Sequence, residues 1–168
     1  VDLALELARM FPADRPLYVA DVGTGSGAVA VALAVHLPQA VVYATDISPR
    51  ALEIARLNCD DPRVQRRVIL LEGNLLAPVP GPVDMVVSNP PYISRADLPH
   101  LSEEVRSEPP DALDGGEDGL SVVRSLVPQA ISKLGRPGGL IMEISPGQGK
   151  EVCGLAHSLA PVGSFSLH

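Results

Sequence analysis

The stretch Leu17–His36, LYVADVGTGSGAVAVALAVH, decides the fold of this chain. It joins a short apolar run ending at Asp21, a turn with three glycines, and a run of small apolar residues that starts at Ala28. Glycine allows a tight turn and lets the backbone approach a ligand where a side chain would collide. The stretch therefore predicts a β-strand over 17–21, a ligand-binding turn and a helix over 28–36.

The same alternation of short apolar strands and helical stretches continues along the chain. Further strands are expected over 41–45, 68–71, 83–88 and 139–144, with the start of a sixth over 163–167. Further helices are expected over 1–11, 49–58 (capped by Ser48), 120–134 (kinked or split at Pro128) and 148–159. Residues 93–119 have no clear period and are expected to form a lid-like loop. This alternation is typical of an α/β fold with an open, mostly parallel sheet and helices on both faces.

The bulk composition excludes several classes of protein. With 168 residues, 46% of them hydrophobic and 20% charged, the chain has the size and composition of one globular domain. A net charge of −7 and a pI near 5.0 argue against nucleic acid as the main partner. The four histidines are scattered, so no metal site is expected, and no apolar run approaches the ~18 to 20 residues of a membrane span. Two cysteines without a CxxC motif favour reduced thiols and a cytoplasmic location.

In open parallel sheets, ligands bind at the carboxyl ends of the strands, where several polar residues of this chain are expected. The glycine turn loosely matches the GxGxxG/A pattern of dinucleotide-binding proteins, and Asp46 could accept hydrogen bonds from ribose hydroxyls in either a dinucleotide or S-adenosylmethionine. Asp21, before the first glycine, favours S-adenosylmethionine, because a carboxylate suits a cationic ligand better than a pyrophosphate. Asn74 could accept a hydrogen bond from the adenine amine, although a simple turn residue after Gly73 explains it too.

A second polar stretch, Ser88-Asn89-Pro90-Pro91-Tyr92, follows the strand predicted over 83–88. The ring of Pro90 keeps Asn89 out of the helical region, so the Asn89 side chain projects in a defined direction. Neither proline has an N–H group, so the carbonyl oxygens of this turn stay free for another partner. A rigid turn that ends a strand, with Tyr92 buried for packing, explains the same residues.

With both segments in view, the chain resembles the class I methyltransferases, and within them the HemK/PrmC family of protein-(glutamine) methyltransferases. The similar blocks are DVGTGSGAVAVALA, ATDISPRALEIARLN, VSNPPYI, EPPDALDGGEDGL and MEISPGQG. NPPY is shared with methyltransferases that act on amino groups of adenine or guanine, whereas the block from Glu108 to Leu120 points to the glutamine branch. The resemblance implies a Rossmann-like catalytic domain over 1–168, without the family's N-terminal helical substrate-binding domain and truncated at the last strands.

The resemblance also implies which residues form the site. S-adenosyl-L-methionine, with S-adenosyl-L-homocysteine as product, is expected at Asp21, Gly23, Thr24, Gly25, Gly27, Asp46, Ile47, Asn74 and Asn89. The substrate glutamine is expected at Asn89, Pro90, Pro91, Tyr92 and Glu108, with Asn89, Pro90 and Tyr92 catalytic. Family members often carry Asp at the position of Asn74. The implied partner is a peptide chain release factor or, in a second branch, a ribosomal protein.

The chemistry of these residue types agrees with that implication. An amide nitrogen is a poor nucleophile because its lone pair is delocalised into the carbonyl. The Asn89 side-chain oxygen and the Pro90 carbonyl oxygen can each accept one amide hydrogen, and the Tyr92 ring can pack against the flat amide. No general base is assigned, because the nitrogen becomes strongly acidic once it is methylated.

Some alternatives remain open. The acidic residues of 93–119 form either a solvated face or a surface that meets a basic protein. A nucleic-acid amino methyltransferase, a nicotinamide oxidoreductase and a binding module without catalytic activity are the rival functions.

Overall fold

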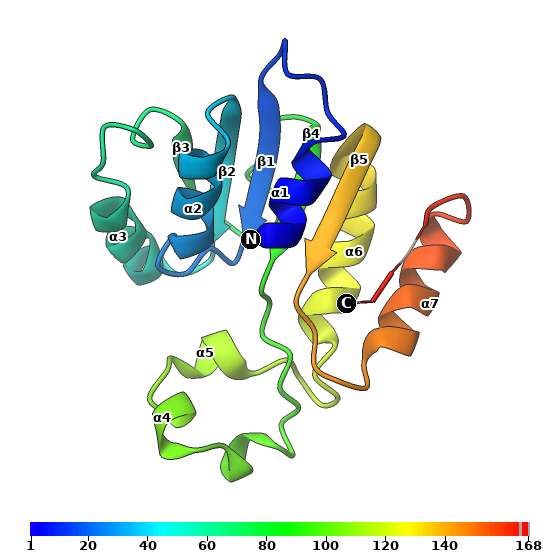
Figure 1. The fold of residues 1–168 in the computed structure, drawn as a ribbon. Helices are drawn as coiled ribbons and strands as arrows, with labels where there is room; N and C mark the ends of the chain where they lie inside the picture. The colour runs from blue at the N-terminus through cyan, green and yellow to red at the C-terminus, as the bar shows by residue number, and fades with distance from the viewer. Residues whose placement is uncertain (165, 168) are drawn as a thin grey trace. The chain divides into compact units, whose positions relative to one another are not determined.

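A computed structural model describes residues 1–164, 166 and 167 (Figure 1). Its elements, in chain order, are α1 (Asp2–Ala8), β1 (Leu17–Val22), α2 (Ala28–His36), β2 (Ala40–Asp46), α3 (Pro49–Asn58), β3 (Val68–Glu72), β4 (Val83–Ser88), the 3₁₀ helix η1 (Leu98–His100), α4 (Glu103–Arg106), α5 (Pro110–Leu113), α6 (Ser121–Lys133), β5 (Leu134–Met142) and α7 (Gly149–Leu159). The chain divides into two compact units, residues 1–89 with 133–142 and residues 90–132 with 143–168. The single catalytic domain expected over 1–168 stays a prediction.

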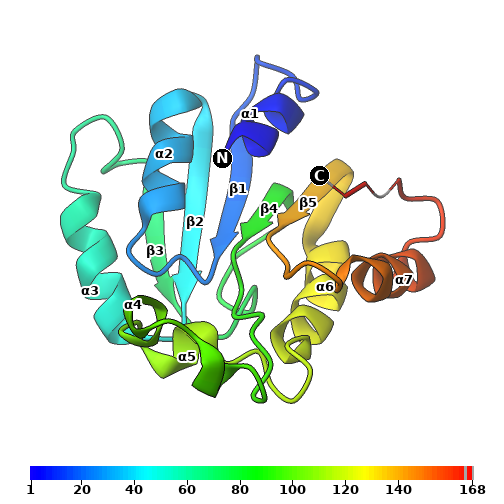
Figure 2. The ribbon, with the colours of Figure 1, turned by 60° about the horizontal axis from the view of Figure 1, so that its bottom comes forward.

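The first unit is built on a five-stranded, all-parallel sheet in the order β3-β2-β1-β4-β5. Strands β2 and β3 extend it on one side of β1, and β4 and β5 on the other, so the order reverses between β1 and β4. Figure 2 brings the carboxyl ends of the strands forward. Every residue of β4 is buried, as expected for a central strand covered on both faces. The predicted α/β fold with a parallel sheet is confirmed.

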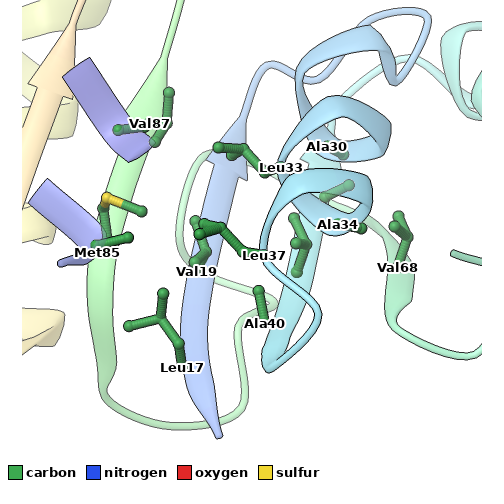
Figure 3. Close-up of a cluster of buried hydrophobic side chains, with 14 of the residues drawn as sticks. Leu17, Val19, Ala30, Leu33, Ala34, Leu37, Ala40, Val68, Met85 and Val87 are labelled. Carbon is green, nitrogen blue, oxygen red and sulfur yellow. The ribbon is translucent and has the colours of Figure 1, made fainter. Parts of the chain in front are cut away.

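The core of this unit lies between the sheet and helices α1 and α2. Leu33 of α2 and Val19 of β1 are fully buried, and Figure 3 shows them in one apolar cluster with Met85 of β4. Two alanines of α2, Ala30 and Ala34, are also fully buried, so the helix approaches the strands closely. Burying one leucine-sized side chain contributes about 1.5 to 3 kcal/mol, so this cluster is the main support of the sheet.

Local signals place α2 and α3 beside the sheet as the sequence predicts. The Ser48 hydroxyl accepts a hydrogen bond from the Ala51 N–H at 3.3 Å, and Pro49 occupies the first turn of α3. Gly27, the N-cap of α2, has a φ of +79°, and a Cβ there would lie 3.1 Å from the Cβ of Ala55 in α3. The glycine turn therefore passes close to α3 only because position 27 has no side chain.

Two elements, β5 and α6, differ from the expectation because of how they pack. Strand β5 spans Leu134–Met142 rather than 139–144, although its first six residues contain Pro137 and three glycines. The sheet tolerates this because the β4–β5 register is irregular between Val83 and Met85. Helix α6 continues through Pro128 and is not split there. Proline removes one intrahelical hydrogen bond, and the buried residues Leu126, Val127 and Ala130 compensate for it by packing.

The second unit contains structure that the sequence pattern did not show. Residues 93–119, expected to be a loop, form the three short helices η1, α4 and α5. Arg95 pairs with Asp114 at 3.2 Å and with Glu117 at 3.4 Å, which ties both ends of this segment together. Helices of three or four residues are too short to show a period in sequence. The sixth strand expected over 163–167 is not formed at residues 163, 164, 166 or 167, and Phe165 lies outside the described residues.

Candidate active site

The Asp21 carboxylate, near the end of β1, is buried beneath the glycine turn, with 2% of the residue exposed. Asp21 Oδ2 accepts a hydrogen bond from the Thr24 hydroxyl at 2.6 Å. Burial, with a smaller contribution from the charge of Asp46, raises the pKa of Asp21 to about 6, although hydrogen bonds from Thr24 and the Ala30 N–H act in the opposite direction. The charged form of Asp21 is thus disfavoured by its surroundings, and a nearby cation would stabilise it.

The Asp46 carboxylate, at the end of β2, holds the turn from the other side. Its Oδ2 accepts from the Gly25 N–H at 2.8 Å, and its Oδ1 accepts from the Ser48 N–H at 2.9 Å. Each carboxylate oxygen has two acceptor positions, so Asp46 keeps capacity for two further donors such as vicinal hydroxyl groups. The structure therefore brings Asp46 and Gly25 together, as the sequence predicts for a cofactor site.

The surface of the glycine turn is open. Gly23 and Gly25 have φ values of +69° and +56°, and a Cβ built at either position would meet nothing within 4 Å. The N–H groups of Gly23 and Thr24 both donate to the Thr45 carbonyl oxygen at 2.9 Å, which fixes the turn without a ligand. An open, preformed glycine surface fits a cofactor that approaches the backbone closely.

Two other predicted cofactor residues follow β2 and β3. Ile47 is 67% exposed, although it is a large apolar residue, and it comes directly after Asp46. Asn74 is exposed as well, and the Gly73 N–H donates to the Asp46 carbonyl oxygen at 3.0 Å, which draws the chain before Asn74 toward the end of β2. An exposed apolar side chain and an exposed amide at one sheet edge suit the face and the rim of an adenine ring.

Asn89 emerges from β4 at the point where strand order reverses. Ser88 pairs with Val22 across the β1–β4 ladder, and the Ser88 hydroxyl donates to the Val22 carbonyl oxygen at 2.8 Å. The next residues, Asn89 and Gly23, therefore leave neighbouring strands at the same level. Such switch points are where open α/β sheets bind their ligands. The Asn89 side chain is exposed and Pro90 is buried.

The remaining predicted substrate residues lie in the second unit. Pro91 and Tyr92 are half-buried, and Glu108 is exposed. Burial raises the pKa of the Tyr92 phenol, helped by a hydrogen bond to Glu143 and by the charges of Glu143 and Glu108. The phenol therefore stays neutral at physiological pH. Glu143 is a residue that sequence reasoning missed; it lies in the MEISPGQG block, which gave the only signal.

Comparison with known proteins assigns a family to this arrangement. Residues 4–125 match the model of the methyltransferase small domain. The chain belongs to this methyltransferase family. It is 53% identical over 143 residues to the release factor glutamine methyltransferase of Moorella thermoacetica, covering 84% of this chain and 50% of that protein. It is 44% identical over 135 residues to the ribosomal protein uL3 glutamine methyltransferase of Bradyrhizobium diazoefficiens, covering 80% of this chain and 42% of that protein.

Solved structures show the same methyltransferase fold. The precorrin-6y C5,15-methyltransferase of Geobacter metallireducens has a TM-score of 0.64 at 15% identity, over 95% of this chain and 69% of that one. TrmN of Thermus thermophilus has a TM-score of 0.61 at 23% identity, over 99% of this chain and 42% of that one. The Rossmann-like class I methyltransferase fold is confirmed, and the nicotinamide oxidoreductase is set aside. The chain spans about half the length of the curated relatives it matches.

Within residues 1–164, 166 and 167, no cluster of three or more His, Cys, Asp or Glu side chains is arranged to hold a metal ion. None of the helices described in this structure is long and apolar enough to cross a membrane.

Proposed function

We propose that the protein transfers a methyl group from S-adenosylmethionine to the side-chain amide nitrogen of a glutamine in another protein. The main support for this proposal is one observation: Asn89 follows the end of β4 at the same level at which the glycine turn follows the end of β1. Two neighbouring strands thus end in an amide acceptor, Asn89, and in a glycine turn. The open surface of that turn and the carboxylates of Asp21 and Asp46 suit a cationic, ribose-containing cofactor. The curated relatives named as glutamine methyltransferases support the same reaction.

In this reaction the bound cofactor supplies an electrophilic methyl group on a sulfonium. Asp46 binds the ribose hydroxyls through its spare acceptor positions, and the buried Asp21 charge favours the cationic end. The Asn89 side-chain oxygen and the Pro90 carbonyl oxygen each accept one hydrogen of the substrate amide, which turns the nitrogen lone pair toward the methyl group. These acceptors stabilise the positive charge that develops on nitrogen. The Tyr92 ring packs against the planar amide, and Glu108 contributes to substrate binding.

The preferred substrate is a glutamine of a peptide chain release factor. Seven curated relatives, 42–53% identical to this chain, are named for that substrate. A ribosomal protein is the second candidate, because one relative at 44% identity is named for uL3. Nucleic acid is disfavoured by the net charge of −7. The two free cysteines agree with a cytoplasmic enzyme.

The test is a methylation assay on the full-length protein with labelled S-adenosylmethionine and three acceptors: a release factor, ribosomal protein uL3, and a mixture of transfer and ribosomal RNA. We expect label on one glutamine of the release factor. Asn89→Ala should abolish it, because the amide loses one acceptor, while Gln65→Ala, which removes an exposed amide on the surface, should not change it.

Each other outcome has a definite meaning. Label confined to uL3 would keep the reaction and correct the substrate. Label on RNA, or a wild-type rate in Asn89→Ala, would refute glutamine methylation through Asn89. Binding of S-adenosylmethionine without transfer to any acceptor would identify a module without catalytic activity.

A further inference from the structure

Tyr92 is held at both ends by side chains from the segment that joins β5 to α7. Its phenol donates a hydrogen bond to Glu143 Oε1 at 3.1 Å. Its main-chain carbonyl oxygen accepts one from Gln148 Nε2 at 3.1 Å. Glu143 and Gln148 therefore fix both the ring and the backbone of the last residue of the NPPY segment.

Both donor hydrogens and the acceptor oxygen of the Gln148 amide take part in this arrangement. Its Nε2 also donates to the Gly119 carbonyl oxygen at 3.3 Å, and its Oε1 accepts from the Ser145 N–H at 2.9 Å. A glutamine amide offers two donor hydrogens on one side and an acceptor oxygen on the other, which matches two carbonyls and one N–H group. No single carboxylate, hydroxyl or apolar side chain of this size could satisfy all three groups.

Gly119 shows how tightly this cluster is packed. A Cβ at Gly119 would lie 2.3 Å from the Tyr92 carbonyl oxygen and 2.6 Å from Gln148 Nε2. The φ of Gly119 is +78°, which also favours glycine. The Tyr92 backbone consequently has little room to move at this point.

Pro90 and Pro91 connect the restrained Tyr92 to the two oxygens proposed to accept hydrogen bonds from the substrate amide. Pro90 and Pro91 have φ fixed by their rings, so the two residues between Asn89 and Tyr92 form a stiff connection. Ser88 anchors its upstream end through its hydrogen bond to Val22, and Gln148 anchors its downstream end. The direction of the Pro90 carbonyl oxygen thus depends on where Tyr92 is held.

We propose that Gln148 and Glu143 are positioning residues for methyl transfer. Gln148 sets the main chain that carries the Pro90 carbonyl oxygen, and Glu143 holds the Tyr92 ring in the orientation that packs on the substrate amide. This inference rests on the proposed glutamine methylation. A misdirected acceptor reduces the reaction rate more than it reduces binding, because alignment matters most in the transition state.

The experiment measures kcat, KM for the protein substrate, the dissociation constant of S-adenosylhomocysteine and the melting temperature of the full-length enzyme. Gln148→Ala should lower kcat about tenfold or more, with cofactor affinity unchanged. Lys150→Ala, an exposed change in the first turn of the same helix, is the matched control and should match the wild type. Glu143→Ala should lower kcat about fivefold, and Glu143→Gln, which keeps an acceptor oxygen, should restore most of it.

A double-mutant cycle isolates the Glu143 contact. If Glu143 acts through the phenol, Glu143→Ala should have no further effect in a Tyr92→Phe background. Additive losses, or a wild-type kcat in Gln148→Ala, would overturn the inference, as would a parallel loss of cofactor affinity. If Gln148→Ala fails to fold, the cycle at Glu143 decides the question. Failure of the proposed function is recognised separately, because the wild-type enzyme would then leave the glutamine unmethylated.

Discussion

The hydroxyl of Ser88 donates a hydrogen bond to the carbonyl oxygen of Val22 at 2.8 Å, inside the β1–β4 ladder. This bond joins the two strands at their carboxyl ends, directly before the glycine turn and directly before Asn89. It fixes the level at which the glycine turn and the NPPY segment leave the sheet.

Ser88→Ala should lower the free energy of unfolding by about 1 kcal/mol, because the buried Val22 carbonyl oxygen loses a partner. Urea denaturation followed by circular dichroism measures this. Ser158→Ala removes an exposed hydroxyl from α7 and should change the free energy of unfolding by less than about 0.5 kcal/mol. Equal effects of the two substitutions would contradict a specific role for the Ser88 bond.

Asp46→Asn should raise the dissociation constant of S-adenosylhomocysteine at least about tenfold. The variant replaces one acceptor oxygen by an NH₂ group, which then faces the N–H of Gly25 or Ser48 instead of accepting from it. Isothermal titration calorimetry measures the change. Glu53→Gln, an exposed neutralisation on α3, is the control for charge. Unchanged affinity in Asp46→Asn would show that ribose hydroxyls bind elsewhere.

Asp21→Asn should change how stability depends on pH. The native pKa of about 6 lies above the ordinary value of 3.8, so the native state binds the Asp21 proton more tightly than the unfolded state. The wild type should therefore lose stability relative to the variant as pH rises from about 4 to about 6, by on the order of 2 to 3 kcal/mol, and remain at the lower level above that. Denaturation midpoints of both proteins between pH 4 and 8 test this.

Comparison with the variant removes the contributions of all other groups that titrate in the same interval. If the wild type instead gains stability relative to Asp21→Asn between pH 4 and 6, the Asp21 carboxylate is stabilised in its charged form and the prediction is wrong.

Gly119→Ala should reduce methyl transfer more than about a hundredfold, because the new Cβ collides with the Tyr92 carbonyl oxygen at 2.3 Å. Gly154→Ala, where a Cβ meets nothing within 4 Å in helix α7, should keep full activity and raise the free energy of unfolding by up to about 1 kcal/mol. Kinetic assays and thermal melting of both variants make the comparison. Normal transfer by Gly119→Ala would show that the Tyr92 backbone can shift without consequence.

Much of the fold follows from local sequence signals. The apolar runs before Asp21, Asp46 and Asn89 predict the central strands, because residues buried on both faces of a parallel sheet form continuous apolar segments. Ser48 and Pro49 likewise predict the start of α3. Local signals are not enough where packing decides: burial around Pro128 keeps α6 from being split, and pairing with β4 holds the glycine-rich start of β5 in the sheet.

The site divides in the same way. The glycine turn, Asp46 and Asn89 are predictable, because strand ends in a parallel sheet share one edge. The contacts of Tyr92 with Glu143 and Gln148 are not, because they join residues more than 50 positions apart and follow from how the second unit folds. The sequence also does not show that the Thr24 hydroxyl donates its hydrogen bond to the Asp21 carboxylate.

Strands β4 and β5 are neighbours in the sheet, yet the chain runs through residues 90–132 between them. The short helices η1, α4 and α5 all belong to this inserted segment. The segment begins after β4 and ends before β5, the strand beside it. The outer part of residues 90–132 can therefore lengthen, shorten or change composition in evolution without changing any strand pairing of the five-stranded sheet. A methyltransferase built this way can change the outer surface of one internal segment while the sheet that carries its glycine turn keeps the same strand order.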